Sequence, residues 1–122
     1  MHDLIKKEFV LESSGSRPIV GDLTYINSNQ EKDLIIFCHG YKGFKDWGCW
    51  NLMAEKFANS GFHFLKFNFS HNGGTIKNPI DFPDLKAFSE NNYSIEVNDV
   101  SRIIKFIKSD KFSLNYKQTH II

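Results

Sequence analysis

The residues whose types and spacing suit chemistry lie in one short turn, residues 39–43, which read His-Gly-Tyr-Lys-Gly. The turn follows the apolar run of residues 34–38, which is typical of a strand covered on both faces. Two glycines without Cβ atoms let a substrate approach the main chain, whose N–H groups stabilise a developing negative oxygen. Such donors contribute roughly 3–4 kcal/mol each to acyl transfer. The turn is therefore a suitable place to stabilise a developing negative oxygen, although many α/β loops carry two glycines.

The elements around this turn alternate between strands and helices. Hydrophobic periodicity predicts a hairpin of two strands, residues 5–12 and 18–26, joined by a turn at residues 13–16. Further strands are predicted over residues 34–38 and 62–69 and from residue 119, and helices over residues 46–60 and 94–109. The order β-β-β-α-β-α-β is typical of an antiparallel hairpin followed by a parallel sheet with helices on its faces.

The second predicted helix has clear start and packing signals. Ser94 is its expected N-cap. Its expected buried stripe consists of Val97, Val100, Ile103, Ile104 and Ile107.

A long irregular loop is predicted over residues 70–93, with glycines at 73 and 74 and prolines at 79 and 83. Loops of that length in compact domains usually serve a function. Ligands of parallel sheets bind beyond the carboxyl ends of the strands. We therefore expect this loop and the turn at residues 39–48 to meet at one functional edge.

Composition excludes several classes of function. The chain has 122 residues, 41% hydrophobic and 24% charged, which predicts one globular domain. The net charge of +1 comes with scattered basic residues, so no nucleic-acid partner is expected. No apolar segment has the length of a signal peptide or a membrane span, and Cys38 and Cys49 form no disulfide framework. A cytoplasmic protein without a membrane association, metal or cofactor is predicted.

Three segments resemble the α/β-hydrolase superfamily, most closely small bacterial esterases and dienelactone-hydrolase or serine-peptidase-like members. Residues 34–48, LIIFCHGYKGFKDWG, look like the third strand and the oxyanion loop. Residues 61–74, GFHFLKFNFSHNGG, look like the fourth strand and its loop, with Asn68 where the family often has Asp. Residues 94–107, SIEVNDVSRIIKFI, look like the following helix with its Asp99. The order of these segments matches over essentially the whole chain.

The resemblance implies roles for individual residues. Tyr41 would supply a backbone N–H to the oxyanion hole, His39 and Gly40 would shape the turn, and Lys42 and Gly43 would line it. His71 and Asn72 belong to a candidate substrate loop. The implied activity is that of a serine hydrolase acting on a small-molecule ester, thioester or amide.

The nucleophile expected from this resemblance is missing. The family carries it in a G-x-S-x-G elbow after the fifth strand, followed by the acid and the histidine. No such pentapeptide occurs in the 122 residues, which end inside the predicted fifth strand. We therefore expect residues 1–122 to be a single partial domain, an incomplete α/β/α architecture truncated before the elbow. Alone it should be inactive and should self-associate through an uncovered sheet edge.

Other interpretations remain open. His39 also fits an ordinary turn residue that bonds the backbone, and Lys42 and Lys45 fit either an anion-attracting pair or solvated surface residues. A non-catalytic half-hydrolase acting as an interaction module is the main alternative function. A phosphate- or nucleotide-binding module, with its anion site at a helix start near residues 43–47, is the other alternative, although G-x-G-x-x-G and Walker motifs are absent.

Overall fold

The computed structural model describes residues 3–13 and 16–122. The elements in chain order are β1 (Leu4–Ser13), β2 (Ser16–Ile26), β3 (Lys32–Cys38), α1 (Trp50–Asn59), β4 (His63–Phe67), α2 (Leu85–Glu90), α3 (Tyr93–Ile107) and β5 (Tyr116–Ile121). The turn predicted at residues 13–16 includes residues 14–15, which lie outside the described part of the chain.

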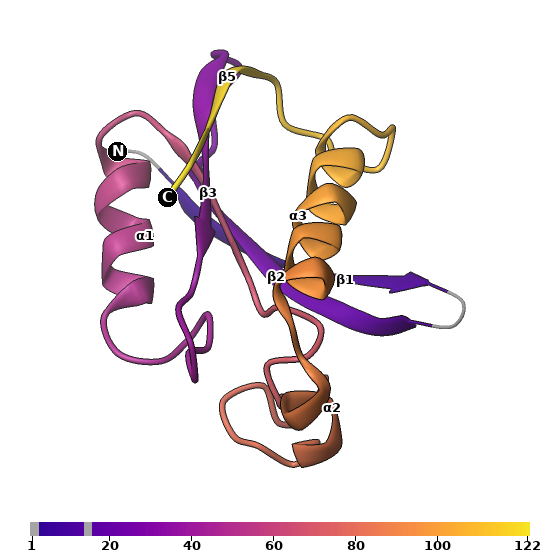
Figure 1. Ribbon diagram of the computed structural model, residues 1–122. Coiled ribbons are helices and arrows are strands. Elements are labelled where there is room, and N and C mark those ends of the chain that lie inside the picture. The colour runs from indigo at the N-terminus through magenta and orange to yellow at the C-terminus, as the bar shows by residue number, and fades with distance from the viewer. Residues whose placement is uncertain (1–2, 14–15) are drawn as a thin grey trace.

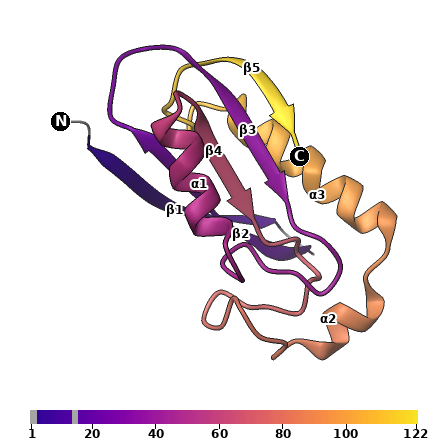
Figure 2. The ribbon, with the colours of Figure 1, turned by 90° about the vertical axis from the view of Figure 1, so that its left-hand side faces the viewer.

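The strands form one sheet in the order β1-β2-β4-β3-β5. β2 pairs antiparallel with both β1 and β4, whereas β3 lies parallel to β4 and to β5. Figure 2 shows the strands side by side, with α1 in front of them. The predicted hairpin followed by a parallel β-α-β-α-β arrangement is thereby confirmed.

The two longer helices cover opposite faces of the sheet (Figure 1). Successive side chains of a strand point to opposite faces, and β3 shows both. Ile35 and Phe37 of this strand pack against α1, while Leu34 and Ile36 pack in the cluster that contains Ile103 of α3. Both faces of β3 are therefore covered by other side chains, as its continuous apolar run predicts.

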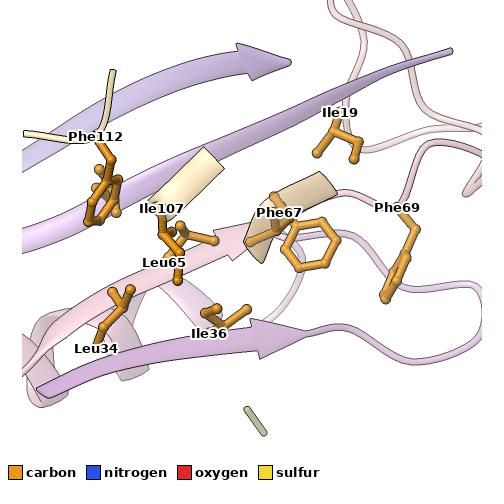
Figure 3. Close-up of a cluster of buried hydrophobic side chains, with 10 residues drawn as sticks. Ile19, Leu34, Ile36, Leu65, Phe67, Phe69, Ile107 and Phe112 are labelled. Carbon is orange, nitrogen blue, oxygen red and sulfur yellow. The ribbon is translucent and has the colours of Figure 1, made fainter. Parts of the chain in front are cut away.

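The larger core cluster lies between the sheet and α3 (Figure 3). Its buried members come from β2, β3, β4 and α3 and from the segments that follow β4 and α3: Ile19, Leu23, Leu34, Ile36, Leu65, Phe67, Phe69, Ile103, Ile107 and Phe112. Phe69 is the residue at which this core reaches the loop after β4. The loop after β4 is thus anchored in the core through Phe69.

The first helix begins later than predicted. α1 starts at Trp50, whereas the sequence predicted a start at residue 46. Gly48 has a φ of 73°, a left-handed conformation that interrupts a right-handed helix. Residues 44–47 form a turn in which the Trp47 N–H donates to the Phe44 carbonyl oxygen. The helix start proposed as an anion site near residues 43–47 is therefore not there.

The loop over residues 70–93 contains a short helix that the sequence did not predict. This helix, α2, is capped by Asp84, whose side chain accepts a hydrogen bond from the Ala87 N–H. α3 follows it and is capped by the Asn92 side chain, which accepts from the Ile95 N–H at 2.9 Å. Ser94, the predicted N-cap, therefore lies inside α3.

The packing face of α3 also differs from the prediction. Its buried residues are Asp99, Ile103 and Ile107, which lie four residues apart on one face. Val97 was predicted to be buried but is 69% exposed. It lies on the side of α3 that lines the cleft at the functional edge.

β5 begins at Tyr116, three residues before the predicted start at residue 119, and most of its residues are exposed. It pairs with β3 at the edge of the sheet, and no described strand pairs with its other side. In the described ranges, 3–13 and 16–122, no helix is long and apolar enough to cross a membrane.

Candidate functional site

The turn after β3 and the loop after β4 meet at a cleft of about 800 Å³. His39, Tyr41 and Lys42 line it from the turn, and Phe69 and Asn72 line it from the loop. The remaining lining residues come from the end of β3, from Gly40 of the turn, from α2, from the two residues between α2 and α3, and from the first half of α3. The structure therefore brings the two predicted segments together at the carboxyl ends of β3 and β4.

The His39 ring is bonded to backbone at both nitrogens. Its Nε2 accepts from the Phe69 N–H at 3.1 Å, so the proton of the neutral ring is on Nδ1. Nδ1 then donates to the Gly40 carbonyl oxygen at 2.9 Å. Burial lowers the pKa of His39, although the bond to Gly40 opposes this effect. A neutral imidazole held in this way braces the turn against the segment after β4.

The peptide bond between Gly40 and Tyr41 is fixed in orientation. The Gly40 carbonyl oxygen accepts from the His39 ring and from the Gly43 N–H, both at 2.9 Å. In a trans peptide the N–H points opposite to the C=O, so the Tyr41 N–H points away from these two partners. Among the described residues no acceptor is bonded to this N–H.

The Tyr41 side chain extends over α2. It is 84% exposed, and its ring stacks on Phe88 with a centroid distance of 5.8 Å. The Lys42 backbone is left-handed with a φ of 58°, and its Nζ lies 5.6 Å from the Tyr41 ring centroid. Lys42 is therefore on the surface, beside the cleft rather than beneath it.

Asn72 links the loop to the turn. Its Nδ2 donates to the Gly43 carbonyl oxygen at 3.3 Å, and its Oδ1 accepts from the Gly74 N–H at 2.9 Å. His71, the other residue of the candidate substrate loop, has its Nδ1 2.8 Å from Ser70 Oγ. Asn72 thus lines the cleft, whereas the His71 ring contacts the side chain of Ser70 in its own loop.

Ser70, His71 and Asp99 lie within hydrogen-bonding distance but do not form a catalytic triad. The Ser70 hydroxyl donates to the Asp99 carboxylate at 2.8 Å, and the Ser70 N–H donates to the same oxygen at 2.8 Å. A catalytic serine instead donates its proton to a histidine that an acid orients. Ser70 is also only 5% exposed. The group fastens the loop after β4 to α3.

A cluster of four charged side chains, two lysines and two aspartates, lies under the turn: Asp22, Lys45, Asp46 and Lys66. The sequence left Lys45 as either an anion-attracting residue or a solvated surface residue, and the structure corrects both: its side chain is 2% exposed and paired with aspartates. Lys45 Nζ contacts Asp22 at 2.8 Å and Asp46 at 2.6 Å. Lys66 Nζ contacts the same two carboxylates at 2.7 and 2.8 Å. Lys66 and Asp22 interrupt apolar strand patterns, and this sequence signal of a buried ion pair was missed.

The pKa values within the cluster follow from these contacts. Burial by itself would lower the pKa of Lys45, but hydrogen bonds and charges from Asp22 and Asp46 outweigh it and raise this pKa. Burial by itself would raise the pKa of Asp46, but Lys45 and Lys66 hold it well below its usual range. Both groups therefore stay charged across the physiological range of pH.

Cys38, at the end of β3, lines the same cleft. Burial raises the pKa of its thiol to about 11, so it is a neutral, weakly reactive group at neutral pH. In the part of the chain that the structure describes, no three His, Cys, Asp or Glu side chains group in a way that could hold a metal ion.

The structure is similar to those of known esterases. A cold-adapted esterase from an Arctic intertidal metagenomic library matches with a TM-score of 0.67 and 16% identity, over 94% of this chain and 49% of that chain. An esterase solved with p-nitrophenol matches with a TM-score of 0.64 and 15% identity, over 99% of this chain and 34% of that chain. No protein-family model and no curated protein sequence matches the chain.

The fold is therefore that of an α/β-hydrolase, as the sequence predicted. The chain spans between a third and a half of the length of the two matched esterases, which fits the expected N-terminal half. At these identities the similarity establishes the fold alone.

Proposed function

We propose that this chain supplies the oxyanion-binding half of a serine hydrolase that acts on small-molecule esters, thioesters or amides. The observation that carries the proposal is the fixed peptide between Gly40 and Tyr41. Its carbonyl is bonded on the inner side, and its N–H is unpaired among the described residues at the rim of the cleft. A preorganised donor of this kind stabilises the oxygen of a tetrahedral intermediate without reorganisation during the reaction.

In the proposed reaction a serine from outside these 122 residues attacks the acyl carbon, and a histidine takes its proton. The carbonyl oxygen becomes negative and accepts a hydrogen bond from the Tyr41 N–H. His39 takes no part in proton transfer, because both of its ring nitrogens are bonded to backbone. Its role is to keep the carbonyl of Gly40, and hence the N–H of Tyr41, in one orientation.

The cleft suits an acyl substrate with an apolar part. Beside the proposed donor it is lined by Phe69, Phe88 and Val100 and by the exposed side chains of Tyr93 and Val97. These residues would cover the apolar part of the substrate while its reacting carbonyl lies near Tyr41.

The isolated chain should be inactive, because a donor for the oxyanion has no effect without a nucleophile and a base. We would incubate the chain with a fluorophosphonate probe and with p-nitrophenyl acetate. We expect no labelled serine and no hydrolysis above the buffer rate, for the wild type and for Ser70→Ala alike. Stoichiometric labelling that Ser70→Ala abolishes would show that the chain carries its own nucleophile and would overturn the proposal.

A second candidate function is that of an interaction module, and the open edge of β5 favours it. No described strand pairs with the outer side of β5, and Ile121 and Ile122 are 52% and 51% exposed. Unpaired strand edges recruit further strands, so we propose that the chain self-associates there. Cys38 and Cys49 are both free thiols, which supports our proposal of a cytoplasmic location.

A further inference from the structure

The four-charge cluster joins the turn to the middle of the sheet. Asp22 comes from β2 and Lys66 from β4, whereas Lys45 and Asp46 come from the segment between β3 and α1. Each lysine contacts both aspartates at 2.6 to 2.8 Å, so the four groups form a closed ring of ion pairs. Three of the side chains are at most 2% exposed, and that of Asp46 is 22% exposed.

Ion pairs and hydrogen bonds fix the positions of the groups that they join more closely than apolar contacts do. Buried charges must keep their partners, because a lone charge in a dry site is strongly destabilising. The Lys45 ammonium is therefore held between the two carboxylates. The backbone of Lys45 is fixed as well, since its N–H donates to Asn68 Oδ1 at 2.8 Å. Asn68 in turn donates to the Pro79 carbonyl oxygen at 3.0 Å.

The turn is thus fastened on both sides of the proposed donor. On one side the His39 ring accepts from the Phe69 N–H. On the other side Lys45 is fixed by its backbone and by its side chain. Between these points Tyr41 and Lys42 are exposed, whereas Phe44 is 4% exposed and its ring contacts that of Phe82 at a centroid distance of 5.0 Å.

We propose that Lys45 is a positioning residue, which sets the place of the Tyr41 N–H through the buried ring with Asp22. The significance of this position for catalysis rests on the proposed function. The effect of Lys45 on the position of the turn does not depend on that function, because it concerns only the geometry of this chain. Lys45 touches no substrate in this account and acts through the backbone of the turn.

The test uses Lys45→Met, which removes the charge and keeps most of the side-chain length. Amide hydrogen exchange is measured by NMR at Gly43, whose N–H bonds Gly40 and so reports whether the turn is closed. The reference is Leu65 in β4, which reports global opening. We expect exchange at Gly43 to accelerate by at least about tenfold more than at Leu65, because local openings are separate from global unfolding.

Lys6→Met is the matched control. Lys6 lies at the rim of the same ring, 3.7 Å from Asp46, and its side chain is 43% exposed. We expect this variant to leave exchange at Gly43 unchanged. Equal acceleration at Gly43 and Leu65 in Lys45→Met would show a purely global role and would overturn the proposal, as would no acceleration at either amide.

The double variant Lys45→Met/Asp22→Asn keeps the test decisive if the single variant fails to fold. It removes one positive and one negative charge, so Lys66 and Asp46 remain as a balanced pair. We expect the double variant to fold and melt cooperatively, with fast exchange at Gly43. Wild-type exchange at Gly43 in this folded variant would mean that Lys45 only balances charge.

The two proposals fail separately. Exchange at Gly43 involves no substrate, so a negative result here leaves the oxyanion role of Tyr41 standing. A labelled serine in the isolated chain would overturn the proposed function and leave the anchoring by Lys45 untouched.

Discussion

Replacing Gly43 by alanine tests how closely the turn is packed against itself. A Cβ atom at Gly43 would lie 2.7 Å from the Gly40 carbonyl oxygen and 3.2 Å from both Gly40 N and His39 Cβ. The nearest of these atoms is backbone and cannot rotate away. It is also the oxygen that orients the Tyr41 N–H. Gly43→Ala must therefore displace the Gly40 carbonyl.

Gly40→Ala is the matched control. A Cβ atom at Gly40 has no neighbour within 4 Å, so the methyl group would extend into open space. Neither glycine is among those with a positive φ, so alanine fits the backbone conformation at both positions. The two variants share the same chemical change and differ only in what the methyl group meets.

The two variants should change the free energy of unfolding in opposite directions. Overpacking costs about 1–3 kcal/mol, and weakening the bond from the Gly43 N–H to Gly40 costs about 1 kcal/mol more. Replacing a glycine by alanine in a compatible conformation stabilises the folded protein by about 0.4–1 kcal/mol, because it reduces the conformational entropy of the unfolded chain. The two costs of Gly43→Ala add up to about 2–4 kcal/mol, and the gain through the unfolded chain offsets about 0.4–1 kcal/mol of this. Gly43→Ala should therefore lose about 1–3.5 kcal/mol, whereas Gly40→Ala should gain about 0.4–1 kcal/mol.

The assay is equilibrium unfolding in urea, followed by the fluorescence of Trp47 and Trp50. The wild type and the two variants are compared at one pH and one protein concentration. Equal stability of the two variants, or a Gly43→Ala variant more stable than the wild type, would refute the close approach of Gly43 to Gly40. The reasoning on the orientation of the Tyr41 N–H would then lose its basis.

Three further predictions concern other parts of the structure. Burial lowers the pKa values of His39 and His63, so near pH 6.5 these histidines bind protons more readily in the unfolded chain than in the folded one. The free energy of unfolding should therefore fall as the pH drops below about 6.5, by at most about 1.4 kcal/mol per pH unit for each histidine. Urea titrations at several pH values measure this fall. Asp99→Ala should cost about 2–3 kcal/mol, because it leaves the buried N–H of Ser70 unpaired and removes the carboxylate bond of the Ser70 hydroxyl. The exposed Asp110→Ala should change stability by less than about 0.5 kcal/mol, and equal losses would contradict the bonding of Ser70. Sedimentation velocity should show concentration-dependent association that Ile121→Lys suppresses; a wild type that stays monomeric at its highest soluble concentration would count against pairing at β5.

Local pattern predicted the order of the elements well. Residues 34–38 are an unbroken apolar run, and β3 is covered by α1 on one face and by α3 on the other. Boundaries were less accurate. The apolar spacing around Trp50 extends toward residue 46, but the positive φ of Gly48 delays the start of α1, and periodicity carries no information about that backbone angle.

The supports of the site depend on contacts between distant residues, which one sequence does not reveal. His39 orients the turn through the Phe69 N–H, 30 residues further along the chain. Lys45 is buried because its Nζ donates to the carboxylates of Asp22, 23 residues earlier in the chain, and of its neighbour Asp46. Taken alone, a lysine after a glycine turn has the pattern of a surface residue. Its burial follows only from the tertiary arrangement of opposite charges.

The central claim is that this chain contributes the oxyanion loop to a serine hydrolase whose nucleophile lies outside the 122 residues. The most direct measurement is to sequence the coding region that follows the codon of Ile122. We predict an open frame that encodes a G-x-S-x-G elbow within a few residues of the end of β5, since the family carries its nucleophile directly after that strand. A stop codon at that point, or a long continuation without such an elbow, would contradict the claim and favour the interaction module.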